Sequence, residues 1–343
     1  MHWNIDELKS KQKKLEKLLN NSLSPQEYQN IKQDIESLKR LIAYADNDSP
    51  KIKYGSSLIV TDNYDKNLLF LKNESANISK DMSSIIKIRK VPYRFFNNKK
   101  LSNDNYYSLV TEFLKKYDED IYEFYEKLQL EKRIELNRRK YKDSNSKGRT
   151  VPIINDGFCY ISTRFNKRLD SASTLLHEVI HAYQLDGIKN LTLLQNKMTS
   201  LFGETYAIFI EYVFCDYLKE TKYNKYGFGL EGNRMDNLLI VINHLLNPLN
   251  ELKLSKYNNG MFYAKSGIYT VRQFRILLSE LLAIYFYNIY LIDKDEAFRT
   301  INEFDSLLGT LPDEMILEKY DFKEIIKGNN KVLTKYLVSY NKE

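Results

Sequence analysis

The chain has 343 residues and a formal net charge of +7, and this length suits one large domain or two smaller ones. Only 12 Gly and 6 Pro accompany 28% charged residues, a composition typical of a mostly α-helical protein. The positive charge is a mild excess for this length and does not by itself indicate nucleic-acid binding. The two cysteines, Cys159 and Cys215, exclude a disulfide framework and a cysteine zinc site, and they suit the reducing cytoplasm.

The N-terminal segment predicts two helices, at residues 4–20 and 25–44, because its apolar residues recur at helical spacing. Between them, Ser24 and Glu27 have the spacing of a capping box, and Pro25 stands at the first helical position. We expect a helical hairpin that packs on the body of the protein, and an arm for a homodimer is the alternative. The N-terminus lacks a basic start before an apolar run, so no signal peptide is predicted.

A polar linker at residues 46–50 separates this hairpin, residues 1–48, from a helical domain over residues 49–343. Between residues 87 and 100, six basic residues are interleaved with three aromatic ones, a pattern that can bind single-stranded nucleic acid. We favour a solvated loop whose aromatic side chains pack inward, and we expect no nucleic-acid partner. Residues 104–140 predict long helices.

The segment 177–181 reads His-Glu-Val-Ile-His and contains two of the four histidines of the chain. On a helix, His177 and His181 share one face, so that both imidazoles can ligate a single zinc ion. Glu178 then lies beside the open position of the metal, where a water binds. The pattern is typical of a zinc-dependent hydrolase, most often a peptidase. The alternative is an ordinary amphipathic helix with two packed histidines.

The residues around this motif predict a buried helix with defined ends. Leu, Val or Ile side chains flank both histidines, so the helix is apolar apart from the His and Glu residues of the motif. Asp170 or Ser171 is expected to cap its start, and Gly187 is expected to end it.

Glu204 is the predicted third ligand, because a catalytic zinc ion takes three protein ligands and keeps a fourth position for water. It opens a second apolar segment, where a carboxylate is costly to bury unless it is paired or bound to metal. Glu211, seven residues on, is expected to share its face and to hydrogen-bond a ligating imidazole, with Asp186 as the competing candidate. The alternative for Glu204 is a salt-bridged carboxylate at the start of a helix.

Two later segments are assigned to structure rather than to function. Residues 227–232 spell a GxGxxG pattern, but no strand pattern precedes it, so we expect a flexible loop between helices. Residues 276–292 are the most membrane-like stretch, yet they are short for a span and contain polar side chains, which favours a buried helix. No membrane association is expected.

The motif and its downstream glutamates resemble the oligoendopeptidase F and thimet oligopeptidase family of zinc metallopeptidases. In that family a second glutamate follows the ligand glutamate at the spacing of Glu204 and Glu211. Lys147–Arg149 is similar to the Lys-Gly-Lys loop of the family, and Phe158–Ile161 is similar to the short strand beside its zinc helix. The similarity continues into the last helices and covers about residues 101–325, with a zinc-site core at about 145–325.

The resemblance implies a mostly α-helical metallopeptidase fold with a small edge strand or sheet beside the zinc helix, and a much shortened N-terminal half. The family stabilises the oxyanion of the reaction with a histidine and tyrosines in a glycine-containing loop. The corresponding region here has no histidine, and Tyr263 and Tyr269 are the candidates for this role.

The expected function is hydrolysis of peptide bonds, with oligopeptides as substrates, in the cytoplasm. His177, His181 and Glu204 hold one Zn²⁺, and Glu178 takes a proton from the attacking water and delivers it to the leaving amine. The substrate is expected to pair with an edge strand near Phe158 and Tyr160. Two alternatives stay open, namely a protease specific for a folded protein, such as an effector or toxin, and an inactive relative that acts as a binding protein.

Overall fold

The computed structural model describes residues 3–45, 103–137, 148–164, 169–232, 234, 238, 261–264 and 267–340. These residues are mostly helical, with a three-stranded and a two-stranded sheet, which confirms the predicted fold class. The predicted linker and the basic segment 87–100 lie outside the described residues. No helix in the described ranges combines the length and the apolar character that crossing a membrane requires.

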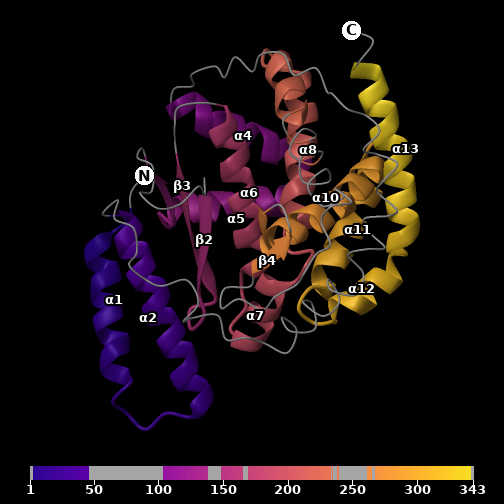
Figure 1. Ribbon diagram of the computed structural model, residues 1–343. Coiled ribbons are helices and arrows are strands. Elements are labelled where there is room, and N and C mark those ends of the chain that lie inside the picture. The colour runs from indigo at the N-terminus through magenta and orange to yellow at the C-terminus, as the bar shows by residue number, and fades with distance from the viewer. Residues whose placement is uncertain are drawn as a thin grey trace. The chain divides into compact units, whose positions relative to one another are not determined.

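The chain divides into two compact units, residues 1–58 with 97–194 and residues 59–96 with 195–343. The first unit contains α1 (Ile5–Leu18), α2 (Pro25–Ala45), α4 (Asn103–Tyr117), α5 (Glu119–Leu130), β1 (Ile134–Asn137), β2 (Gly148–Ile153), β3 (Phe158–Arg164), α6 (Asp170–Leu185) and the start of α7 (Leu191–Thr199) (Figure 1). Its strands lie in the order β1-β3-β2, with β1 parallel and β2 antiparallel to β3.

The prediction of long helices over residues 104–140 is confirmed up to Leu130 and is wrong at residues 131–137, and residues 138–140 lie outside the described residues. Asp118 separates α4 from α5 and caps α5 by accepting a hydrogen bond from Ile121 N at 2.9 Å. After Leu130 the backbone turns at Lys132, which adopts a φ of 54°, and residues 134–137 then form β1. Pairing with β3, which is distant in sequence, therefore overrides the local helical pattern.

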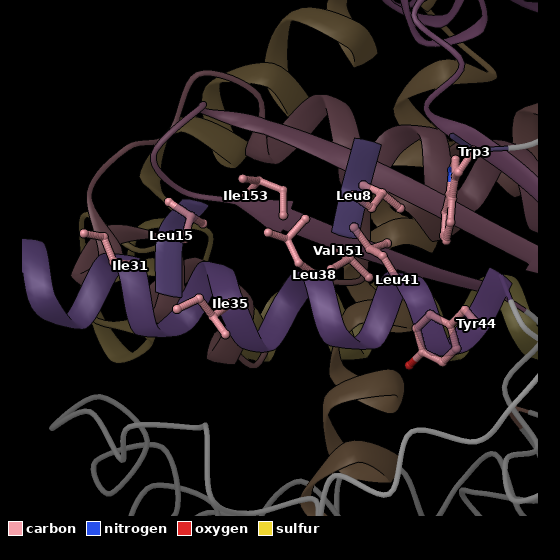
Figure 2. Close-up of a cluster of buried hydrophobic side chains, with 10 residues drawn as sticks. All are labelled: Trp3, Leu8, Leu15, Ile31, Ile35, Leu38, Leu41, Tyr44, Val151 and Ile153. Atoms are coloured by element: carbon pink, nitrogen blue, oxygen red, sulfur yellow. The ribbon is translucent and has the colours of Figure 1, made fainter. Parts of the chain in front are cut away.

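The N-terminal hairpin forms as predicted, with its capping box in place. Ser24 N donates to Glu27 Oε2 at 2.9 Å, and Glu27 N donates to Ser24 Oγ at 3.3 Å. The apolar seams of α1 and α2 meet β2 in one hydrophobic cluster (Figure 2), made of Trp3, Leu8, Leu15, Ile31, Ile35, Leu38, Leu41, Tyr44, Val151 and Ile153. Packing on the body of the protein, the favoured alternative, is therefore what the hairpin does within this unit.

Buried polar contacts fix how the hairpin sits on the sheet. Asp34 of α2 is fully buried and accepts hydrogen bonds from Ile154 N at 2.6 Å and from Asn155 N at 3.0 Å, in the turn between β2 and β3. Burial raises the pKa of the Asp34 carboxyl, and these two N–H donors partly offset that rise. Trp3 N also donates to Glu135 Oε2 at 2.8 Å. The sheet and hairpin are thus held by directional bonds as well as by apolar contact.

Asp34→Ala is expected to lower the free energy of unfolding by about 2–4 kcal/mol, because it leaves two backbone N–H groups without their acceptor. Urea unfolding followed by circular dichroism measures the change. Glu36→Ala is the matched control, since Glu36 makes a partly exposed pair with Lys39 and should change stability by about 0.5 kcal/mol or less. Equal losses in the two variants would contradict the anchoring role of Asp34.

The second unit contains the end of α7, α8 (Thr205–Lys219), a helical stretch at 224–232, β4 (Met261–Ala264), β5 (Gly267–Thr270), α10 (Val271–Tyr290), α11 (Lys294–Leu307), α12 (Asp313–Lys319) and α13 (Phe322–Tyr340). Helix α10 is the buried helix predicted for the segment 276–292, and it packs against α8, α11 and α13. In Figure 1, α13 runs along the outer side of α11 and α12.

Residues 227–232 are helical, so the predicted flexible loop is wrong. Gly227 explains the difference, because a Cβ at this position would lie 2.6 Å from Cys215 O and 2.9 Å from Lys219 N of α8. The glycine therefore permits close packing of two helix backbones rather than a mobile turn. Cys215 itself is a buried free thiol, as expected from its apolar helix.

Candidate metal centre

The sheet of the first unit presents two different faces, because side chains alternate along each strand. Opposite residues in the β2–β3 pair point to the same face, so Val151 and Tyr160 lie together on the hairpin side. Thr150 and Ile161 lie together on the other face, where Thr150 contacts α6. The helix that carries the two histidines is thus seated on the sheet face opposite the hairpin.

Helix α6 begins and ends at defined residues. It begins at Asp170 after Leu169, and no side chain caps it, so the predicted capping by Asp170 or Ser171 is wrong. The predicted end is confirmed, because Gly187 follows Leu185 closely and adopts a φ of +76°. Gly187 N donates to Gly157 O at 2.7 Å, which ties the end of the helix to the turn before β3.

The two histidines converge on one side of α6. His177 Nε2 and His181 Nε2 lie 3.1 Å apart, and the imidazole planes are nearly perpendicular, at 84°. The other ring nitrogen of His181, Nδ1, lies 3.1 Å from Gln184 Oε1. Gln184 is buried and three residues further along the same helix, so its spacing could have identified it as the partner of His181.

Glu178 turns toward β2, and the residue is buried, with 7% of its surface exposed. Thr150 Oγ1 lies 2.9 Å from Glu178 Oε2 and 2.9 Å from Glu178 O. Gly148 lies at the same place, because a Cβ there would be 2.5 Å from Glu178 Oε1 and 2.6 Å from its Cγ. The hydroxyl of Thr150 therefore holds the Glu178 carboxylate, and Gly148 leaves room for it.

Glu204 lies in the second unit, at the N-terminus of α8, and its side chain makes no capping hydrogen bond. The rest of α8 is buried on every side, as its apolar sequence predicts. Arg275 of α10 lies beside Glu204, with Nη2 at 3.4 Å from Oε1. Ser279, one turn further along α10, accepts a hydrogen bond from Glu204 N at 3.3 Å.

The two candidates for an outer carboxylate partner have contacts of their own. Asp186 lies 3.8 Å from Lys127 Nζ, an ion pair within the first unit. Glu211, which is buried, forms an ion pair with Arg234, and Arg234 also binds Glu280. Hydrogen bonding of either carboxylate to a histidine stays a prediction.

The residues predicted to bind substrate lie elsewhere than expected. β3 is the central strand of the sheet, so Phe158 and Tyr160 do not themselves lie on an edge strand, and their role in binding substrate stays a prediction. Phe158 and Tyr160 pack on the hydrophobic cluster of the hairpin, with Arg133 3.9 Å from the Phe158 ring centroid. The outer strand that contacts α6 is β2. Tyr263 and Tyr269 lie on the paired strands β4 and β5, and their oxyanion role stays a prediction.

Comparison with solved structures finds similar folds over nearly the whole chain. A structure described as oligoendopeptidase F of Bacillus anthracis has a TM-score of 0.51 at 14% identity, covering 97% of this chain and 64% of that one. PZ peptidase A has a TM-score of 0.49 at 13% identity, covering 96% of this chain and 67% of that one. A structure described as a peptidase from Chlamydophila abortus has a TM-score of 0.48 at 13% identity, with coverages of 98% and 63%.

The likeness to the Bacillus anthracis structure confirms, at the level of the fold, the resemblance seen in the sequence. At 14% identity the likeness is one of fold: the chain has the mostly α-helical fold of a structure described as oligoendopeptidase F. The chain spans 64% of the length of the Bacillus anthracis protein. No protein-family model and no curated protein matches the sequence.

Proposed function

We propose that this protein is a zinc-dependent peptidase in which His177, His181 and Glu204 hold one zinc ion. The observation that carries the proposal is the 3.1 Å separation of the two Nε2 atoms on α6. Two nitrogen donors at about 2.0–2.1 Å from a tetrahedral ion lie roughly 3.3–3.4 Å apart, so the pair needs little movement to share a metal.

The chemistry of the donor set fits zinc. Two imidazoles and one carboxylate, each on a half-buried residue, are a known set of protein ligands for a catalytic zinc ion. The Gln184 oxygen beside His181 Nδ1 suits a protonated Nδ1, which leaves Nε2 as the ligand atom. The cysteines take no part, because burial raises the pKa of both the Cys159 and the Cys215 thiols.

When bound, zinc supplies a Lewis acid that polarises the scissile carbonyl and acidifies the attacking water. Glu178 takes the proton of that water and later gives it to the leaving amine. Thr150 restricts the Glu178 carboxylate to one position by its hydroxyl contact with Oε2. Gly148 leaves the space which that position requires. Tyr263 or Tyr269 is proposed to donate a hydrogen bond to the developing oxyanion.

The substrate is proposed to be an extended peptide that pairs with the outer strand β2. Within the described ranges β2 has a strand neighbour on one side, β3, and so it offers its other side for backbone pairing. This strand contains Gly148 and Thr150, the two residues that contact Glu178. A peptide paired there would run next to the proposed base.

The test is hydrolysis of a mixture of short peptides by the purified full chain, followed by mass spectrometry. We expect cleavage that stops with 1,10-phenanthroline and returns when zinc is added. Cleavage of whole proteins but not of short peptides would favour a protein-specific protease. Zinc binding without any cleavage would contradict the peptidase proposal and would favour a binding protein.

Gly148→Ala is expected to lower kcat for peptide hydrolysis by about 100-fold, because its Cβ would displace the Glu178 carboxylate by about an ångström. Zinc content should not change, since neither proposed histidine ligand is touched. Steady-state kinetics and elemental analysis measure the two quantities. Gly328→Ala serves as a control, at a glycine of α13 whose Cβ would meet nothing within 4 Å. A Gly148→Ala enzyme with unaltered kcat would refute this arrangement.

A further inference from the structure

The segment between α7 and α8 ends at Glu204 and is held by side chains from two other helices of the second unit. Ser279 Oγ of α10 donates to Leu201 O at 3.1 Å and accepts from Glu204 N at 3.3 Å. Asp313, the buried first residue of α12, accepts from Ser200 Oγ and from Leu201 N, both at 2.7 Å. The backbone that carries Glu204 is therefore fixed from two directions.

Arg275, one turn before Ser279 on α10, contacts the same segment with both terminal nitrogens of its guanidinium group. Nη1 donates to Met198 O at 2.5 Å, near the end of α7, and Nη2 lies 3.4 Å from Glu204 Oε1. Arg275 is mostly buried, with 22% of its side chain exposed. The guanidinium group thus links the end of α7 to the side chain of Glu204, which directly precedes α8.

One nitrogen of the Arg275 side chain lacks a hydrogen bond to the rest of the described chain, which is destabilising. Its Nε is buried and has no hydrogen-bond partner among the described residues. An unpaired buried donor is destabilising and is rare in folded proteins unless the group serves another purpose. The contact with Glu204 supplies such a purpose, because it restricts a carboxylate that makes no capping bond to its own helix.

Gly203 shows that the backbone accommodates this guanidinium. A Cβ at position 203 would lie 2.4 Å from Arg275 Nη2 and 3.2 Å from Arg275 Cζ. Any side chain there would therefore displace the arginine or the segment itself. The absence of a side chain at Gly203 therefore makes room for the guanidinium of Arg275.

We propose that Arg275 is a positioning residue, which occupies Glu204 Oε1 and leaves Oε2 to ligate the metal. This inference rests on the proposed zinc site and adds to it a residue that does not touch the ion. Hydrogen-bonded partners of metal ligands orient them, and their loss typically lowers metal affinity by about 10–100-fold.

The test compares zinc affinities of folded full-length variants by competition with a chromophoric chelator. Arg275→Met and Gly203→Ala are each expected to weaken zinc binding by about 10–100-fold, one by removing the guanidinium and the other by displacing it. Arg275→Lys keeps a cation beside Glu204 and should bind zinc more tightly than Arg275→Met. Far-ultraviolet circular dichroism of the zinc-free chains verifies that each is folded.

Arg299→Met is the matched control, because Arg299 pairs with Glu296 and Glu303 at the surface of α11. It should bind zinc as the wild type does. Wild-type affinity in Arg275→Met, or equal affinities in Arg275→Lys and Arg275→Met, would overturn the role of Arg275 while leaving the zinc site intact. A wild-type chain that binds no zinc would overturn both proposals.

Discussion

Glu178→Gln is expected to lower peptide hydrolysis by about 10²–10⁴-fold while zinc content stays at the wild-type level. The amide has nearly the shape of the carboxylate, and its oxygen can still accept the hydrogen bond from Thr150. It cannot take a proton from water, so the general base alone is lost. Single-turnover cleavage of a fluorogenic peptide, with elemental analysis of the same sample, measures both quantities.

Glu123→Gln is the control for this change, because Glu123 is an exposed carboxylate on α5 of the same unit. It should cleave peptide at the wild-type rate. If Glu178→Gln kept that rate as well, Glu178 would not be the base. If it lost zinc together with activity, Glu178 would contribute to holding the metal.

His181→Ala is expected to weaken zinc binding by roughly 10²–10³-fold and to remove activity at ordinary zinc concentrations. The binding free energy of a four-donor zinc site is about 10–16 kcal/mol, so each donor contributes about 2.5–4 kcal/mol. The Nε2 of His181 lies 3.1 Å from that of His177, and its removal leaves one imidazole on α6. Chelator competition measures the affinity.

His2→Ala is the control, since it removes a histidine that no part of the proposed site uses. The prediction requires that only His181→Ala lose affinity. Raising the zinc concentration should partly restore cleavage by His181→Ala, because Glu178, the proposed base, is still present. Unchanged affinity in His181→Ala would mean that the two imidazoles are packed core residues, the alternative that the sequence left open.

The helix of the candidate site could be predicted because its information is local. The four-residue spacing of His177 and His181 brings their rings to one face of α6, and Gly187 ends that helix as expected. The capping box of the hairpin likewise involves residues three apart, Ser24 and Glu27. Such features need nothing more than the geometry of one helix.

The contacts that hold Glu178 and Glu204 of the candidate site could not be predicted, because they join residues far apart in sequence. Thr150 contacts Glu178 across 28 residues, and Arg275 reaches Glu204 from a different helix. Neither pair has a spacing that a periodic pattern could reveal. Gln184, by contrast, lies three residues from His181 on the same helix, so helical spacing alone predicts that the two side chains meet.

Three of the wrong predictions share one physical cause, which is that tertiary packing decided the structure of a segment. Residues 134–137 follow a helix and read as its continuation, yet they pair with β3. Residues 227–232 have a glycine-rich sequence typical of a loop, yet they are helical, and Gly227 allows their backbone to pack closely against α8. Phe158–Ile161 was correctly predicted as a strand, but its central place between β1 and β2 depends on partners that the sequence does not identify.

The most direct measurement is a crystal structure of the zinc-loaded chain, with anomalous differences recorded on both sides of the zinc absorption edge. We expect one peak, bonded to Nε2 of His177, Nε2 of His181 and a carboxylate oxygen of Glu204. No peak beside the two imidazoles, or a peak there with the Glu204 carboxylate directed elsewhere, would contradict the account.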